Sequence, residues 1–129
     1  MKKNILKKYN SLGFCIIKNV LTKNKIKSIQ ETIIDRVNLD FNKNFNKNDF
    51  DKNFFHKYLL NKRKESPEKF SNFYSSLQTN VNIFSIASDK KLKNIVKKIL
   101  QIKKDFLNCS DFLLRADAPF DKRNSLDWH

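Results

Sequence analysis

Two histidines and two cysteines are the side chains of this sequence whose ordinary pKa values lie nearest neutral pH, and both residue types can bind a metal. His129 follows Asp127 by two residues, and side chains two residues apart on a β-strand share one face. This pair could therefore present a carboxylate and an imidazole together, while an exposed histidine with no ligand is the alternative for His129. Cys15 and Cys109 lie in apolar surroundings and belong to no CxxC or Cys/His cluster, which favours buried free thiols over a zinc site.

His56 and Arg115 have ordinary structural roles as their simplest interpretation. His56 stands among Phe54, Phe55 and Tyr58, so we predict that its ring packs on a helix face. Arg115 follows an apolar run, and a salt bridge is the role expected of it.

Lysine gives this sequence its charge, because 27 Lys and Arg against 13 Asp and Glu leave a formal net charge of +14. Lysine, asparagine, isoleucine and phenylalanine are encoded by A/T-rich codons, so codon usage explains the charge as well as an acidic partner does. Only four residues are arginines, the residue favoured for bidentate recognition, so no specific nucleic acid is expected. Residues 90–104 nevertheless combine lysines with an apolar stripe. This pattern keeps open a basic helical module that binds nucleic acid or an anionic membrane surface.

The elements that position these residues are predicted to be mostly helices, because apolar side chains recur at helical spacing. Gly13 is predicted to form a turn with positive φ, followed by a β-branched apolar strand over residues 14–21. The asparagine-rich residues 38–53 form an irregular loop held by aromatic side chains. Thr22, Ser66 (before Pro67) and Ser88 are the predicted helix N-caps. The predicted helices cover residues 2–10, 23–37, 54–63, 67–84 and 89–100.

The C-terminal residues have strand-like patterns in place of helical spacing. Residues 106–107 and 112–116 resemble strands, and 125–129 could begin another, but a stable sheet usually needs three or more strands. We therefore expect the sequence to be a fragment cut where a β-rich region begins.

A single glycine excludes a dinucleotide-binding fingerprint and a P-loop. The sequence has no signal peptide and no apolar run of membrane-spanning length, so the expected location is cytoplasmic.

The two ends of the sequence resemble phytanoyl-CoA dioxygenase-like proteins. Residues 9–21, Tyr-Asn-Ser-Leu-Gly-Phe-Cys-Ile-Ile-Lys-Asn-Val-Leu, are similar to the opening of that family, which continues into a helix much like residues 22–37. Residues 114–119, Leu-Arg-Ala-Asp-Ala-Pro, followed by 126–129, Leu-Asp-Trp-His, resemble the approach to the family's H-x-D iron motif. The order and separation of the two patterns make the resemblance more specific than either pattern alone.

The resemblance implies an oxidoreductase: an Fe(II)/2-oxoglutarate-dependent dioxygenase that hydroxylates a small-molecule or acyl substrate. The implied fold is α+β, with residues 1–105 as a helix-rich region with a leading strand. Residues 106–129 would be the first strands of a truncated double-stranded β-helix, or jelly roll, on which that region packs. His129 would be the first metal ligand and Arg115 a cosubstrate-binding residue, whereas the carboxylate, the distal histidine and the main 2-oxoglutarate-binding residue are missing. The 129 residues alone are therefore expected to be inactive. A helical structural protein without an active site is the remaining alternative.

Overall fold

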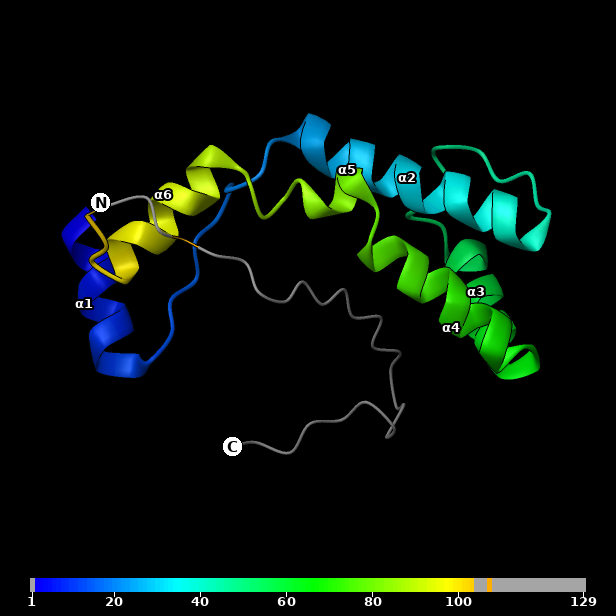
Figure 1. Ribbon diagram of the computed structural model, residues 1–129, viewed down its shortest axis with the longest axis horizontal. Coiled ribbons are helices and arrows are strands. Elements are labelled where there is room, and N and C mark those ends of the chain that lie inside the picture. The colour runs from blue at the N-terminus through cyan, green and yellow to red at the C-terminus, as the bar shows by residue number, and fades with distance from the viewer. Residues whose placement is uncertain (1, 104–106, 108–129) are drawn as a thin grey trace.

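The computed structural model describes residues 2–103 and 107, which form helices joined by turns and one longer loop (Figure 1). Two groups of helices are visible: α1 and α6 lie side by side at one end, and α2, α3, α4 and α5 form the rest. The helices are α1 (Lys2–Leu12), α2 (Lys23–Phe41), α3 (Asn53–Glu65), α4 (Pro67–Gln78), α5 (Val81–Phe84) and α6 (Lys90–Ile99).

The predicted α+β fold is wrong, because the described residues contain helices and no strand. The leading strand predicted over residues 14–21 is an irregular, partly extended connection between α1 and α2. A β-branched apolar run favours extended backbone, but a strand also needs a neighbouring strand for its hydrogen bonds. The predicted packing of the helical region on a double-stranded β-helix is absent from the described residues, and all of residues 106–129 except Leu107 lie outside them.

The core lies among α2, α3, α4 and α5, which we call the α2–α5 body. Most of its buried side chains come from the predicted helical stripes, since residues three, four or seven apart share one face of a helix. Phe41 was predicted to lie in the loop, and Ile83 is buried where the predicted stripe had Val81 and Phe84, which are exposed. Side chains of the loop between α2 and α3 close one side of this core. The buried residues are Ile34, Val37, Phe41, Phe55, Phe73, Leu77 and Ile83.

The loop between α2 and α3 is held by one asparagine and two aromatic rings. The Asn38 side chain donates to the backbone carbonyl of Phe45 at 2.9 Å and accepts from the Phe45 N–H at 2.8 Å. Phe45 and Phe50 pack against the core, with ring centroids 5.2 and 5.7 Å from that of Phe55. The prediction of an irregular loop held by aromatic residues is confirmed, although helix α2 continues to Phe41 before the loop begins.

Helix boundaries follow local capping. Thr22 is confirmed as an N-cap, because its side chain accepts from the Lys25 N–H at 3.2 Å. Pro67 opens α4, but the Ser66 side chain makes no capping hydrogen bond. The Ser88 prediction is wrong: the carboxylate of Asp89 caps α6, accepting from two backbone N–H groups. Carboxylate caps also complement the positive end of the helix dipole.

The predicted helix over residues 67–84 is two helices. It is interrupted at Thr79 and Asn80, where the Asn80 side chain accepts from the N–H groups of Asn82 and Ile83 at 2.9 and 3.4 Å. The short side chain of asparagine competes with the helical hydrogen bonds and starts a new helix. Helix α5 therefore changes direction and packs against both α2 and α4.

Tyr58 supplies a testable detail of this core. Its hydroxyl is buried and has no hydrogen-bond partner among the described residues, and burial raises the pKa of the phenol. The cost of an unpaired buried hydroxyl disappears in Tyr58→Phe, so this variant is expected to be as stable as the parent or up to about 1 kcal/mol more stable.

The raised pKa of Tyr58 also gives the direction of a pH effect. The unfolded phenol releases its proton near pH 10, before the folded one, so stability falls as the pH rises from there through the folded pKa. Urea denaturation at neutral and alkaline pH measures both effects: Tyr58→Phe should lose less stability on going to alkaline pH. An equal alkaline loss in both proteins would contradict this.

Candidate functional site

The residues predicted to form an iron site lie outside the described part of the chain. His129, Asp127 and Arg115 all fall there, as does Cys109, so the structure gives no geometry for metal or cosubstrate binding by them. Within the residues that it does describe, no three His, Cys, Asp or Glu side chains converge on a point where a metal could sit. The described helices therefore supply no iron site by themselves, and no catalytic step through iron is derived.

The other candidates have structural roles where they are described. Cys15 is a half-buried free thiol, rather than the fully buried one that was predicted. The ring of His56 lies on α3 with its centroid 5.7 Å from that of Phe50, which confirms the predicted packing role. The imidazole remains exposed to solvent.

The segment between α1 and α2 has a defined backbone path. Gly13 has a φ of +74° and donates its N–H to the carbonyl of Tyr9 at 2.8 Å, which ends α1 and confirms the predicted turn. Residues 14–18 then run without regular secondary structure until Asn19, which also has a positive φ of 56°. Asparagine tolerates this left-handed conformation better than most residues. Two such turns redirect the chain between α1 and α2.

Side chains alternate between exposed and half-buried positions along this segment. Phe14, Ile16 and Lys18 are exposed, while Cys15 and Ile17 between them are half-buried. Phe14 is 61% exposed and Ile16 is 82% exposed. Residues 14–17 are all apolar, so the sequence gives no alternation that could have indicated an exposed side.

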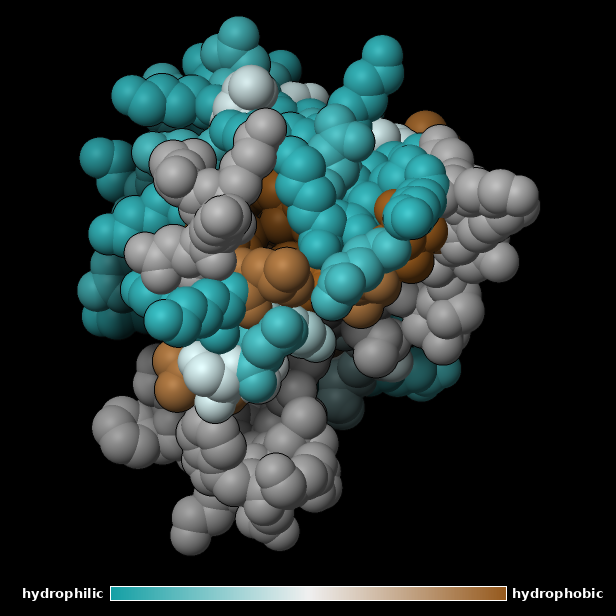
Figure 2. All heavy atoms as spheres, turned by 90° about the vertical axis from the view of Figure 1, so that its left-hand side faces the viewer, coloured by the Kyte–Doolittle hydropathy of each residue, from teal (hydrophilic) through white to brown (hydrophobic). Residues whose placement is uncertain are grey.

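Helix α6 packs against α1 through half-buried side chains only. Its stripe of Leu92, Ile95, Val96 and Ile99 is half-buried, and no residue of α6 is fully buried. The Lys91 ammonium donates a hydrogen bond to the carbonyl of Asn19, which joins the start of α6 to the 13–22 connection. Figure 2 looks at this end and shows apolar side chains near its centre with hydrophilic ones around them. We call α1, residues 13–22 and α6 the α1–α6 end.

Charge is distributed unevenly between the two groups of helices. The sequence has no acidic residue before Glu31, and α6 contains none, although Asp89 caps it. Four ion pairs of the described residues lie on α2, α3 and the loop between them: Lys27–Glu31, Arg36–Asp40, Lys47–Glu31 and Lys62–Glu65. Among the described residues, the segments of the α1–α6 end thus contribute many lysines and few carboxylates, so these segments carry concentrated positive charge.

An open depression of about 340 Å³ lies at the C-terminal end of α6. It is lined by Asn94, Lys97, Lys98, Gln101, Ile102 and Lys103, with no acidic side chain among them. Such a lining favours an anion over a cation or a neutral apolar molecule. No helix in the described part of the chain combines the length and the apolar composition that a membrane crossing requires.

Comparison with known proteins found no matching family model, no matching curated protein and no matching solved structure. The resemblance to dioxygenases therefore depends on the residues that carry it at the two ends of the sequence. The uneven charge and the exposed apolar residues of the α1–α6 end are the features that the structure contributes.

Proposed function

We propose that this sequence is the helix-rich part of an Fe(II)/2-oxoglutarate-dependent oxygenase that resembles the phytanoyl-CoA dioxygenases. The observation that carries the proposal is the pair of patterns in the right order: residues 9–21 before an amphipathic helix, and residues 114–119 before Leu126-Asp127-Trp128-His129. His129 is the proposed first iron ligand, in a site of two histidines and one carboxylate that leaves metal positions open for 2-oxoglutarate and oxygen. Iron would supply the oxidising chemistry with oxygen as the oxidant and 2-oxoglutarate as the cosubstrate that is oxidised to succinate and CO2, and a small-molecule or acyl compound would be the substrate.

Local geometry near the N-terminus is compatible with this proposal. Helix α1, the Gly13 turn and the helix capped by Thr22 follow one another in the order of the family pattern, but the strand of that pattern is not formed, since residues 14–18 have no regular secondary structure. Arg115 has a proposed secondary role in binding the cosubstrate, since a guanidinium can hold a carboxylate through two parallel hydrogen bonds.

The first test is the DNA that follows the codon for His129. The proposal expects Gln-Asp or a close variant next, and a second histidine and an arginine further downstream. A stop codon, or a continuation without these residues, would overturn the oxygenase proposal.

The second test is biochemical and uses the matched pair of histidines. The longer reading frame should convert 2-oxoglutarate to succinate in the presence of Fe(II), and the 129-residue chain should not. His129→Ala should abolish the conversion, because one of the metal ligands is lost. His56→Ala removes an exposed imidazole on α3 and should leave the rate unchanged. Equal rates in the parent and His129→Ala proteins would refute the assigned role.

A further inference from the structure

We infer that the α1–α6 end binds the surface of an anionic lipid bilayer. The inference does not depend on the proposed oxygenase activity, because it comes from the arrangement of exposed apolar and lysine side chains at this end. The central feature is a strip that we call the 8–18 strip, made of Lys8, Leu12, Phe14, Ile16 and Lys18.

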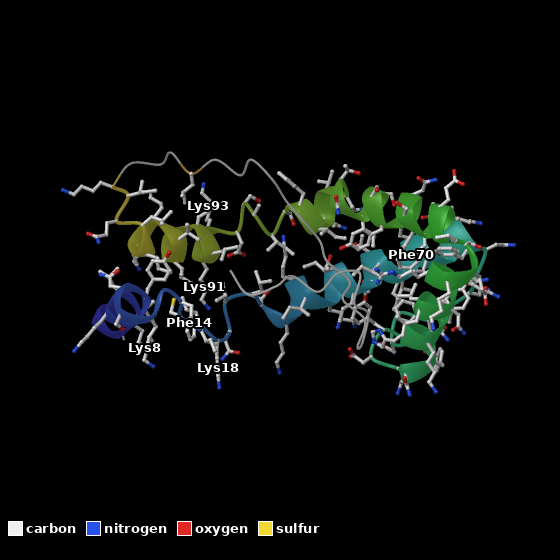
Figure 3. All side chains as sticks on the ribbon, turned by 90° about the horizontal axis from the view of Figure 1, so that it is seen from below. Lys8, Phe14, Lys18, Phe70, Lys91 and Lys93 are labelled. Atoms are coloured by element: carbon white, nitrogen blue, oxygen red, sulfur yellow. The ribbon has the colours of Figure 1, made fainter. Side chains whose placement is uncertain are left out.

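The backbone places these five side chains in two groups on either side of the Gly13 turn. Lys8 and Leu12 are four residues apart on α1 and therefore lie on the same face of the helix. Beyond the Gly13 turn, Phe14, Ile16 and Lys18 are the exposed members of the alternating segment. Figure 3 shows Lys8, Phe14 and Lys18 on the same side of the ribbon.

Large apolar side chains are exposed close together along this strip. Leu12, Phe14 and Ile16 are 60%, 61% and 82% exposed, and they occur within five consecutive residues. Single exposed apolar residues are common on protein surfaces, but a contiguous group marks a place where the protein meets another apolar phase. A lysine flanks the group on each side.

Charge identifies the phase as an anionic bilayer. Residues 2–30 contain lysines but neither an acidic residue nor an arginine, and the same holds for residues 90–103. Lysines near a membrane surface are attracted by its negative lipids, while adjacent apolar side chains enter the region between headgroups and acyl chains. Nucleic acid would use the lysines but would leave Leu12 and Ile16 in water, and it is more often recognised through arginine.

Helix α6 extends the charged surface beside the strip. Lys90, Lys91 and Lys98 are exposed, and Lys91 is joined to the carbonyl of Asn19 next to Lys18. Figure 3 shows Lys91 projecting from α6 toward the connection that carries Phe14 and Lys18. The positive charges of two segments far apart in the sequence therefore act together on one bilayer surface.

The experiment is co-sedimentation of the 129-residue chain with vesicles. Vesicles of phosphatidylcholine alone are compared with an equimolar mixture of phosphatidylcholine and phosphatidylglycerol, at increasing NaCl concentration. Binding to the anionic vesicles is expected, with an affinity that decreases as salt screens the charges, and little binding to the neutral vesicles. No binding to anionic vesicles, or equal binding to both kinds, would overturn the inference.

Matched variants locate the binding surface. Phe14→Ser combined with Ile16→Ser should lower the affinity for anionic vesicles by at least about tenfold, because two apolar side chains no longer leave water. Leu39→Ser combined with Val81→Ser is the control, since these residues are 72% and 82% exposed but belong to the α2–α5 body. Circular dichroism and the unfolding midpoint confirm that each variant is folded.

A second pair of variants tests the charges. Lys8→Gln with Lys18→Gln should weaken binding by at least about tenfold, whereas Lys57→Gln with Lys64→Gln removes two exposed lysines of α3 and should have a much smaller effect. Equal losses in the two charge variants would overturn the assignment to the 8–18 strip.

Binding to single- and double-stranded DNA of random sequence is measured in parallel. Tighter binding to DNA than to anionic vesicles would overturn the bilayer as the partner and indicate nucleic acid instead.

Discussion

Phe55→Ala is expected to destabilise the α2–α5 body by about 3–5 kcal/mol. Phe55 is fully buried, and the centroids of Phe45 and Phe50 lie 5.2 and 5.7 Å from its own. Truncation removes these contacts and leaves a cavity that the surrounding side chains fill only partly. The loop between α2 and α3 should lose its order as well, because both of its packed rings rest on Phe55.

Phe54→Ala is the matched control for this substitution. Phe54 is the preceding residue of α3 and is 53% exposed, with one stacked contact to Phe45 at 6.1 Å between centroids. Urea denaturation followed by circular dichroism gives the free energy of unfolding for both variants. Phe55→Ala should show a much lower midpoint, and similar losses in the two proteins would show that the core is not centred on Phe55.

Ile83→Ala is expected to cost about 2–5 kcal/mol. Ile83 is fully buried in α5, a helix of four residues that cannot be stable without tertiary packing. Besides the packing of Ile83, two side-chain hydrogen bonds connect α5 and its C-cap to α2: the Asn82 side chain donates to the Thr32 hydroxyl at 3.2 Å, and Lys25 donates to the Ser85 hydroxyl. Loss of the isoleucine should therefore release α5 from α2 and α4.

The neighbouring Val81 provides the control for Ile83. It starts the same short helix but is 82% exposed, so Val81→Ala should change the free energy of unfolding by less than about 0.5 kcal/mol. Hydrogen exchange resolves the two cases further: amides of α5 should exchange faster in Ile83→Ala and at the parent rate in Val81→Ala. Unchanged exchange in Ile83→Ala would mean that α5 does not depend on this side chain.

Most helices of the α2–α5 body could be predicted from the sequence, because their signals are local. The stripe that begins at Ile26 marks α2, Thr22 caps it and Pro67 opens α4. The wrong predictions concern positions where two neighbouring side chains could each cap or interrupt a helix, and the spacing of apolar residues does not show which one does. Asp89 replaces Ser88 as the cap of α6, and Asn80 divides a continuous apolar stripe into two helices.

The candidate sites show a different limit of sequence reasoning. The proposed iron ligand His129 and the proposed cosubstrate residue Arg115 were found by pattern, but they fall outside the described residues. The 8–18 strip was missed, because residues 14–21 were predicted to form a strand. Composition alone could not separate the two outcomes, since the same apolar residues suit a strand in a sheet and an exposed connection.

The sequence by itself determined the amphipathic helices, the Gly13 turn and the strongly positive charge, because periodicity, backbone preference and formal charge are properties of neighbouring residues. Only the tertiary structure decided which apolar residues are covered. Ile34 and Phe55 are buried because other helices supply partners for them, whereas Phe14 and Ile16 remain exposed beside lysines because no described element packs over them. Burial depends on which distant segments meet, and pairing of α1 with α6 across most of the chain cannot be deduced from either segment alone.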